Sequence, residues 1–351
     1  MRRWSVVENG KPLQAITTPD LVPQNCEILL EVSHCGVCHS VLHFVKGEFD
    51  LGNGQTLRTL DRGVQLPCAP GHEIVGRVVA LGPDATGAQI GDHRIIYPWM
   101  GCGTCELCTT DQENHCYQSR SLGMIQDGGF GSHVMVPNAS YLFAFDGIDP
   151  ALASTFACSG LTVYSAIRKL QPLSPTKPVL LFGAGGLGLA AIAMLRALGH
   201  QRIFSADVQA EKRQGALAAG AEKAFDPGAP DLVAEVTAAA GGPLAYVIDF
   251  VNMRSTVTVA MECLAKNGKL VLVGVGGGDY SLSLAGMIFR PRSIIGNITG
   301  SRQDLREVIA LAQSGKLAPV PITRMPKDSA NEALDLLHHG HVHGRLVLEG
   351  A

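Results

Sequence analysis

The sequence has no dense run of lysine and arginine and no apolar run long enough to span a bilayer. Lysine and arginine number 28 against 31 aspartates and glutamates, which gives a net charge of −3, so a nucleic-acid partner and a membrane are not expected. The most apolar helical stretch, residues 186–199, is interrupted by Arg196 and is too short to cross a membrane. Two arginines near the start precede no apolar segment, so no secretory signal is expected either. We therefore expect a cytoplasmic protein.

Charged residues are also scarce overall. They make up 17% of the residues against 46% apolar residues, a composition typical of a globular protein. A length of 351 residues suits two domains. Before about residue 150, short β-like runs alternate with glycine and proline. Beyond it, apolar strands alternate with helical segments, which predicts a parallel sheet covered on both faces. We expect residues 1–159 with 298–351 to form a β-rich domain, and residues 160–297 an α/β domain.

Ten cysteines are present, and in a long chain without a signal they should stay reduced. Cys26, Cys68 and Cys263 stand among apolar or turn residues and are expected to be small buried hydrophobes. Four others follow the spacing C-x2-C-x2-C-x7-C, namely Cys102, Cys105, Cys108 and Cys116. Four thiolates on a glycine-rich loop can close around one structural zinc ion. An iron–sulfur cluster is the alternative, but its common short run has a different last gap and a following proline.

The motif GAGGLG stands between an apolar strand and a helical segment. Its spacing is that of a dinucleotide-binding turn. Gly183 permits the tight turn, Gly185 lets the backbone approach a pyrophosphate, and Gly188 allows close packing of helix on strand. Free N–H groups at the helix start favour phosphate. A glycine turn without a ligand is the alternative interpretation.

An acidic residue ends the next apolar strand, about 20 residues after the motif. Asp207 stands where a carboxylate accepts hydrogen bonds from the adenosine ribose. A carboxylate there repels a 2′-phosphate, so NAD(H) is expected to be preferred over NADP(H). Lys212 and Arg213 lie close by in the sequence and weaken that expectation.

Three separated stretches contain further metal-ligand residue types. They are CGVCHSVLH from Cys35, APGHEIVG with His72 and Glu73, and STFACSGLTVYSA with Cys158. One cysteine, one histidine and another cysteine can make a three-ligand zinc site with an open fourth position. Spacing alone does not show that these residues meet.

GVCHS, the GHE stretch, the four-cysteine segment and GAGGLG occur in an order that resembles the zinc-dependent medium-chain alcohol dehydrogenase family. The resemblance covers essentially the whole chain. It implies a Rossmann doubly wound parallel sheet and a GroES-like catalytic domain that carries a four-cysteine zinc lobe. The stretches GEFDLGNGQTLRTLDRGVQLP, YPWMGCG, QDGGFG and FACSGLTVYSA resemble the bacterial group typified by 6-hydroxyhexanoate dehydrogenase.

The resemblance also implies two zinc ions per chain and the roles of individual residues. Cys38, His72 and Cys158 would hold the catalytic zinc, whereas His34 and Cys35 would be neighbours only. Zinc would lower the pKa of an alcohol, whose carbon gives hydride to nicotinamide.

The same resemblance implies a proton path and a set of cofactor contacts. Ser40 would take the alcohol proton, which would leave through the cofactor ribose and His43. Glu73 would assist ligand exchange. The implied cofactor-binding residues are His39, Thr162, Gly183, Gly185, Gly186, Leu187, Gly188, Asp207, Lys212, Val273, Val275 and Arg345.

One position departs from the family pattern. Val41 stands where many members have an aspartate that accepts the free ring N–H of the zinc-binding histidine. Losing such a partner typically lowers metal affinity or activity by about 10–100-fold. Either a carbonyl or water replaces the aspartate here, or the zinc site is weak.

Several features allow a second interpretation. His43 can be a plain core histidine, and the four histidines from His338 to His343 are expected at the surface near a helix end. Trp99 can be plain core packing, whereas the family resemblance implies that it lines the substrate pocket. The segment between Gly47 and Pro67 is expected to cover the substrate entrance, where Arg58 and Arg62 can meet a carboxylate or remain solvated.

We therefore expect an NAD-dependent zinc dehydrogenase that acts on a primary alcohol or ω-hydroxy acid. The alternatives are a polyol or secondary-alcohol dehydrogenase and a zinc-binding relative that has lost the reaction. The chain length resembles that of bacterial tetramers, with a dimer as the alternative, and SIIGNITG from Ser293 is the expected edge strand of the interface.

Overall fold

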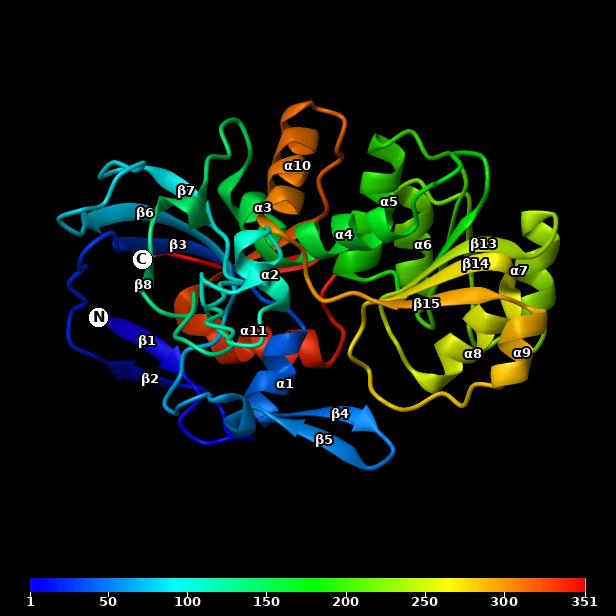
Figure 1. Ribbon diagram of the computed structural model, residues 1–351, viewed down its shortest axis with the longest axis horizontal. Coiled ribbons are helices and arrows are strands. Elements are labelled where there is room, and N and C mark those ends of the chain that lie inside the picture. The colour runs from blue at the N-terminus through cyan, green and yellow to red at the C-terminus, as the bar shows by residue number, and fades with distance from the viewer. Residues whose placement is uncertain (351) are drawn as a thin grey trace.

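The computed structural model describes residues 1–350 and contains two large sheets, which lie at opposite ends of the molecule (Figure 1). The six-stranded sheet is parallel, in the order β12-β11-β10-β13-β14-β15. Its strands are β10 (Val179–Phe182), β11 (Ile203–Ala206), β12 (Lys223–Phe225), β13 (Leu244–Asp249), β14 (Leu264–Leu272) and β15 (Arg292–Gly296). β10 and β11 are fully buried, as expected of apolar runs in a sheet covered on both faces.

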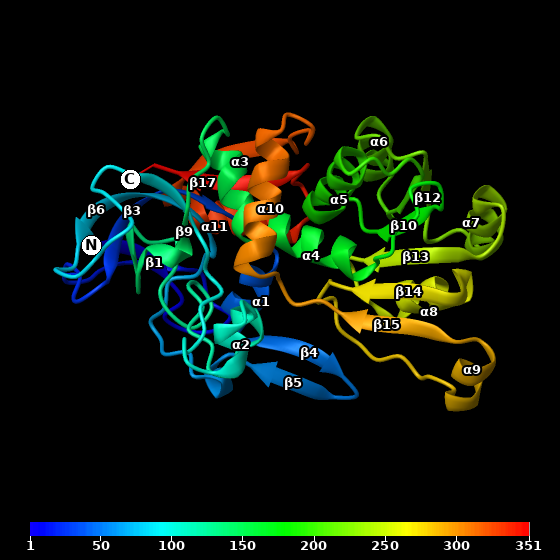
Figure 2. The same cartoon turned by 45° about the horizontal axis from the view of Figure 1, so that its top comes forward.

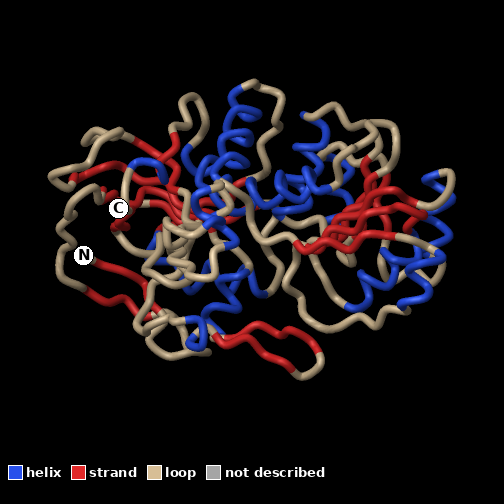
Figure 3. Tube along the Cα trace, in the orientation of Figure 1, coloured by secondary structure: helices blue, strands red, loops and turns tan. Residues whose placement is uncertain are grey.

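Helices follow most of these strands and cover both faces of the parallel sheet (Figure 3). They are α5 (Gly186–Ala197), α6 (Ala210–Ala218), α7 (Leu232–Ala240), α8 (Arg254–Cys263) and α9 (Leu284–Phe289). The predicted doubly wound sheet is therefore confirmed. Its carboxyl edge faces the other half of the molecule, which is where ligands bind in sheets of this kind.

The seven-stranded sheet has the order β16-β17-β3-β6-β7-β9, with β8 paired to β3. Its strands are β3 (Ile28–Gly36), β6 (Glu73–Leu81), β7 (His93–Ile96), β8 (His133–Val136), β9 (Leu142–Phe143), β16 (Ile322–Pro326) and β17 (Arg345–Glu349). Only β16 and β17 pair in parallel. β17 comes from the end of the chain, so both termini of the sequence contribute to this half.

Short elements surround the seven-stranded sheet. They are the hairpins β1–β2 (Arg2–Ser5, Gln14–Thr17) and β4–β5 (Glu48–Gly52, Gln55–Arg58), the helices α1 (Ser40–Lys46), α2 (Glu106–Thr109), α10 (Arg302–Gln313) and α11 (Ala330–His338), and the 3₁₀ turns η1 (Leu60–Arg62), η2 (Glu113–His115), η3 (Ala139–Tyr141) and η5 (Lys327–Ser329). Figure 2 shows β4–β5 extending from α1 toward the parallel sheet.

One long helical segment lies between the two sheets and was not anticipated from the sequence. It comprises α3 (Pro150–Thr155), a π-helical turn (Phe156–Gly160) and α4 (Leu161–Lys169). Asp149 caps its start by accepting a hydrogen bond from Leu152 N at 3.1 Å. The segment is long and apolar enough to cross a membrane, but 78% of its most apolar window is buried inside the fold, as in the core helix of a globular protein.

The expected burial of three cysteines is correct for two of them. Cys68 and Cys263 are buried, whereas Cys26 is exposed. Cys26 lies in the loop before β3, where its thiol approaches the carbonyl oxygen of Asp84 at 3.6 Å. A small side chain in a surface loop carries no local sequence signal that separates it from a buried one.

Candidate active site and metal centres

Cys38, His72 and Cys158 come from three separate segments and meet between the two sheets. Their donor atoms lie within 4.8 Å of one another, and all three residues are buried. Cys38 lies between β3 and α1, His72 directly precedes β6, and Cys158 lies in the π-helical turn. The two sulfurs are 3.9 Å apart, close to the edge of about 3.8 Å that a tetrahedron with Zn–S bonds of about 2.3 Å requires. The donor set therefore fits a zinc ion with an open fourth position.

The protonation of this cluster also suits a dication. Cys158 and Cys38 share a hydrogen bond, which holds the pKa of Cys38 well below its usual range and raises the pKa of Cys158. A bound dication favours both thiolates, so metal binding releases a proton. Ser40 lies at the rim of the cluster, where its hydroxyl donates to the Cys38 sulfur at 3.2 Å and lies 3.5 Å from His72 Nε2.

Glu73 and Arg345 form a buried ion pair directly behind the cluster. Their side chains are 0% and 5% exposed, and Glu73 Oε1 also accepts a hydrogen bond from Ser159 N at 3.0 Å. Burial raises the pKa of Glu73, and the positive charge of Arg345 partly offsets this. Arg345 also packs against Gly186 of the glycine motif, where any side chain would collide with it. The pair therefore joins the metal-ligand cluster to the glycine turn of the other half.

The four remaining motif cysteines surround a second common point. Their sulfurs lie within 4.8 Å of one another, with separations of 3.5 Å for Cys105–Cys108, 3.8 Å for Cys105–Cys116 and 3.9 Å for Cys102–Cys108. None forms a disulfide. Hydrogen bonds from Thr104 lower the pKa of Cys102 to about 6, which favours the thiolate that zinc requires. This closed set of four thiols fits a structural zinc site.

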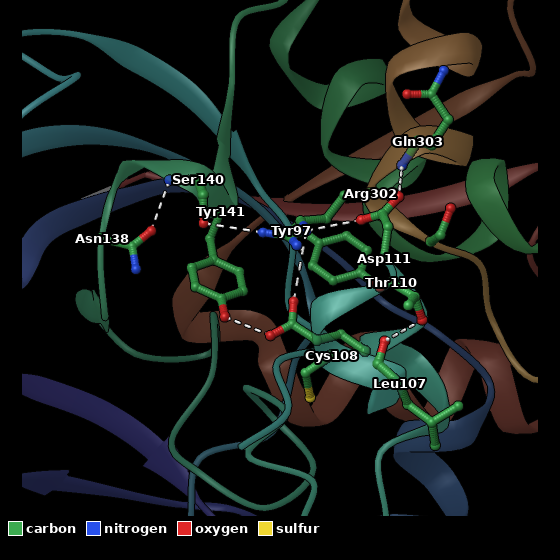
Figure 4. A network of polar contacts seen from close by, with 12 residues as sticks. Tyr97, Leu107, Cys108, Thr110, Asp111, Asn138, Ser140, Tyr141, Arg302 and Gln303 are labelled. Atoms are coloured by element: carbon green, nitrogen blue, oxygen red, sulfur yellow. Dashed lines mark hydrogen bonds and ion pairs between the residues drawn. The ribbon is translucent and has the colours of Figure 1, made fainter. Parts of the chain in front are cut away.

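A polar network fastens this four-cysteine lobe to α10 (Figure 4). Arg302 donates to Asp111 at 3.0 Å and lies 3.6 Å from Glu113, and both carboxylates belong to the lobe. Tyr141 donates its hydroxyl to Glu113 at 2.7 Å, and the guanidinium of Arg302 lies 5.6 Å from the centre of the Tyr141 ring. These contacts join residues far apart in the chain, and no local sequence pattern indicates them.

Replacing Cys116 by serine is expected to remove one zinc per chain and to lower the free energy of unfolding by more than about 3 kcal/mol, because a structural metal contributes directly to folding. Metal content by atomic emission and thermal unfolding by calorimetry measure both effects. Cys26→Ser changes an exposed thiol outside the lobe and serves as the control. An unchanged zinc content in Cys116→Ser would contradict the assignment of this cluster.

The glycine motif forms an open cradle at the start of α5. Gly183 has a φ of +90°, which favours glycine. A Cβ on Gly188 would collide with the carbonyl oxygen of Gly183, so this glycine is needed for close packing. A Cβ on Gly185, by contrast, would meet no atom of residues 1–350 within 4 Å. Within the same residues the buried hydroxyl of Thr162 finds no hydrogen-bond partner. The open space beside Gly185 fits a dinucleotide here, and Thr162 on α4 offers a hydroxyl that is still unpaired.

Asp207 directly follows β11 beside this cradle. Its carboxylate accepts hydrogen bonds from Ala184 N at 2.8 Å and Gln209 N at 2.9 Å. Arg213 turns to Asp226 at 3.1 Å and to the main-chain carbonyl of Asp207 at 2.8 Å. The negative charge at the end of β11 is therefore held in place, and Arg213 is already engaged by another carboxylate.

The other predicted cofactor residues belong to elements of both halves of the molecule. Leu187 lies in the first turn of α5, Val273 and Val275 follow β14, and Lys212 lies on α6. His39 directly precedes α1. Burial lowers its pKa most, Cys38 opposes this, and His338, Lys212 and Arg345 lower it further. Lys212 from one half and Arg345 from the other therefore both act on His39, and positive charge there favours an anionic ligand.

Comparison with known proteins decides the family. Residues 24–145 match the family model of the alcohol dehydrogenase GroES-like domain, and residues 186–314 match that of zinc-binding dehydrogenases. The chain is 35% identical over 350 residues to a protein of Sulfurisphaera tokodaii named NAD-dependent alcohol dehydrogenase, covering 99% of both chains. The chain belongs to the zinc-dependent medium-chain alcohol dehydrogenase family. It is therefore an oxidoreductase with alcohol dehydrogenase activity.

Other family members show the same relationship. The chain is 30% identical over 326 residues to an alcohol dehydrogenase of Geobacillus stearothermophilus, covering 92% of this chain and 91% of that one. The crystal structure of the alcohol dehydrogenase from Aeropyrum pernix superposes with a TM-score of 0.90 at 27% identity over the full length of both chains. A D-arabinose dehydrogenase from Sulfolobus solfataricus superposes with a TM-score of 0.84 at 25% identity, covering 99% of both chains.

The position that departs from the family pattern leaves a buried donor without an acceptor. His72 Nδ1 is buried, and no atom of residues 1–350 accepts a hydrogen bond from it. Val41 is itself fully buried in the core. A protein carbonyl therefore does not replace the usual aspartate, which leaves water or a weak zinc site.

The remaining sequence candidates lie beside the metal cluster, in the buried core or at the surface. Trp99 packs on His72, with ring centroids 5.0 Å apart, and donates to Ala157 O at 2.9 Å. Cys35 lies outside the metal cluster, and burial raises its pKa to about 12. Arg58 and Arg62 are exposed, and neither forms an ion pair with any residue that the structure describes. The tail histidines His338, His339, His341 and His343 are also exposed.

Proposed function

We propose that this enzyme catalyses reversible hydride transfer between NAD(H) and a primary alcohol or ω-hydroxy acid and the matching aldehyde. The observation that carries the proposal is the open cluster of Cys38, His72 and Cys158, with the Ser40 hydroxyl at its rim. We assign the catalytic zinc to this cluster and a structural zinc to the four-cysteine lobe. Zinc in the open site supplies a Lewis acid that lowers the pKa of an alcohol.

The side chains of this chain then have separate tasks. Ser40 Oγ takes the alcohol proton, because it is the hydroxyl next to the metal ligands. His43 follows one turn later on α1 and is partly exposed, so its ring can release that proton to water. Burial, together with the charges of His39 and Lys46, lowers the pKa of His43. The ring is therefore mostly neutral at pH 7 and able to accept a proton.

Around these groups, other residues hold the reactants. Trp99 packs over His72 and gives the pocket an apolar wall that excludes water. The glycine turn, Thr162, His39, Lys212 and Arg345 bind and orient the cofactor. Glu73 keeps Arg345 in place, and by the family pattern it assists ligand exchange at the metal.

The first experiment compares initial rates of NAD⁺ reduction with 6-hydroxyhexanoate and with 1-hexanol at equal concentrations. A preference for the acid would support the ω-hydroxy acid group and direct attention to Arg58 and Arg62. A preference for hexanol would leave an apolar pocket. Cys38→Ser, which removes one metal ligand, should abolish both rates. No rate with either substrate in the zinc-loaded enzyme would contradict the proposal.

A polyol or secondary-alcohol dehydrogenase is the second candidate. The structural similarity to a D-arabinose dehydrogenase favours it, because that protein's name indicates a sugar substrate. Rates with 2-propanol and with D-arabinose in the same assay separate the two candidates.

For the cofactor we infer that NAD is preferred over NADP, since the carboxylate of Asp207 stands at the end of β11. Asp207→Asn is expected to raise kcat/KM for NADP⁺ relative to NAD⁺ by about 10-fold or more, since placing like charges together costs several kcal/mol. The amide keeps an acceptor for Ala184 N or Gln209 N, so the turn should remain folded. Steady-state kinetics with both cofactors give the ratio. An unchanged ratio would show that Asp207 does not select the cofactor.

We further propose a homotetramer or dimer in the cytoplasm, and a division into residues 1–159 with 298–351 and residues 160–297. β15 is an open edge of the parallel sheet, and Ile294 and Ile298 on or beside it are 36% and 53% exposed. On α9 beside it, Leu284, Ile288 and Phe289 are at least 76% exposed. An apolar open edge favours pairing with a second copy. Light scattering after size exclusion gives the mass.

A further inference from the structure

The β4–β5 hairpin lies outside the metal clusters and the glycine turn, yet it reaches the proposed proton path. Its strands Glu48–Gly52 and Gln55–Arg58 directly follow α1, the helix that carries Ser40 and His43. Phe49 on β4 stacks on His43, with ring centroids 5.1 Å apart and an angle of 21° between the planes. The family pattern assigns no role to Phe49.

The chain geometry fixes this stack at its base. Gly47 ends α1 with a φ of 88° and donates to the carbonyls of His43 at 2.9 Å and Phe44 at 3.1 Å. This left-handed turn folds β4 back over the helix. Thr59, which is 4% exposed, closes the hairpin by donating from N and Oγ1 to Gly47 O at 2.9 and 3.2 Å. Phe49 is therefore attached two residues beyond a fixed point.

The far end of the hairpin rests on the other half of the molecule. A Cβ on Gly277 would lie 3.0 Å from Asp50 Cβ, and a Cβ on Gly52 would collide with the main chain of Gly278. Gly277 and Gly278 belong to the loop after β14, the strand that leads to Val273 and Val275. The hairpin thus reaches from α1 to the loop after β14 and is held at both ends (Figure 2), which limits the movement of Phe49.

His43 itself has few other restraints. Within residues 1–350 no hydrogen bond to its ring nitrogens acts on its pKa, and its one other ring neighbour is His39, at 5.9 Å between centroids. The charged groups that face it are His39 and Lys46, with Cys38 further off. Without hydrogen bonds to fix the ring, stacking on Phe49 is what sets its orientation and removes one of its faces from water.

We propose that Phe49 is a positioning residue for the proton path: its ring holds the imidazole of His43 in place between Ser40 and the solvent and shields it. This inference rests on the proposed role of His43. For each alcohol oxidised, hydride leaves with the cofactor and one proton leaves through Ser40 and His43 to water. Phe49 touches no reactant and acts only through His43.

Loss of the Phe49 ring is expected to raise the pKa of His43. Burial is the largest cause that lowers the pKa of His43, so removing the ring exposes the imidazole and raises its pKa toward the usual value. More His43 is then protonated at a given pH and unable to accept a proton. The acid limb of the kcat profile for alcohol oxidation therefore moves to higher pH. At pH 7 most of the ring still stays neutral, because its pKa rises no further than the usual value of about 6.5, so most of the loss there comes from a misplaced ring. Relays of this kind contribute at most about 10²–10⁴-fold, and we expect Phe49→Ala to lower kcat at pH 7 by about 3–10-fold.

The test uses zinc-loaded full-length enzyme and four variants. Phe49→Ala removes the ring, and Phe49→Leu keeps apolar bulk without the stack, so it also serves if the alanine variant folds poorly. Leu51→Ala is the matched control, because Leu51 lies on the same strand and is 54% exposed. His43→Gln removes the proton acceptor. The readouts are kcat and KM across pH, and the NMR titration of the His43 ring.

We expect Phe49→Ala to lower kcat with KM for NAD⁺ unchanged, and to move both the acid limb and the NMR titration of His43 to higher pH. Phe49→Leu should give a smaller shift, and Leu51→Ala none. Wild-type behaviour of Phe49→Ala beside an impaired His43→Gln would overturn the positioning role alone. A wild-type pH profile in His43→Gln would overturn the proton path and, with it, this inference.

Discussion

Replacing Val41 by aspartate is expected to raise the affinity of the active-site cluster for zinc by about 10–100-fold, the usual contribution of a partner to a metal-binding histidine. The physical reason is the buried Nδ1 of His72, for which no described residue supplies a hydrogen-bond acceptor. A buried donor without a partner destabilises the folded state and leaves the ring free to turn. A carboxylate at position 41, where the family pattern has one, would accept that N–H, fix the tautomer and make Nε2 a better ligand.

The measurement is competition for zinc between the protein and a chromophoric chelator. The four-cysteine lobe provides an internal reference, because its release of metal should not change. Val41→Ala serves as the control for altered packing, since it removes buried atoms without supplying an acceptor. If Val41→Asp releases the active-site metal as readily as the wild type does, then His72 needs no protein group to accept its N–H.

Replacing Arg345 by methionine is expected to lower the free energy of unfolding by about 3–5 kcal/mol, the loss observed when one partner of a buried ion pair is removed. Glu73, which is 0% exposed, would be left without a compensating charge. The loss should exceed that for a surface pair such as Arg77 and Glu31, which contributes about 0–1 kcal/mol.

The double variant Glu73→Gln with Arg345→Met tests whether the uncompensated charge of Glu73 causes this loss of stability. Removing both charges should recover most of the lost stability, because no ionised group then remains buried. Cofactor binding should not recover, since Arg345 also lies against Gly186. Chemical denaturation gives the free energies, and fluorescence titration with NADH gives the affinity. If the double variant is as unstable as the single one, packing and not charge holds this region.

The sequence predicted those parts of the fold that depend on local patterns. EIVGRVVAL and PVLLF become β6 and β10, because their apolar residues match a buried strand. GAGGLG is recognisable because the close approach of Gly188 to Gly183 allows no side chain. The four cysteines of the lobe could be read as a unit because they lie within fifteen residues of one another.

The parts that were not predicted depend on residues distant in sequence. Glu73 and Arg345 pair across 272 positions, and Arg302 meets Asp111 across 191. Arg302 has no local signal that distinguishes it from a solvated surface charge, and the family resemblance implies Arg345 as a cofactor contact without indicating its pairing with Glu73. The stack of Phe49 on His43 is local, yet it depends on the reversal at Gly47. The π-helical turn was not predicted because no pattern around Cys158 distinguishes it from an ordinary helical turn.

That π-helical turn constrains the length of the whole central helix. A π turn has one residue more than an α turn, and each residue rotates a helix by about 100°. α3 packs on β3 and β6, whereas α4 packs on α5 and α10. The two halves of this helical segment therefore bury faces that point in different directions. Deleting a single residue between Phe156 and Gly160 would leave both halves helical but turn one apolar face toward water. This segment should therefore accept neither an insertion nor a deletion.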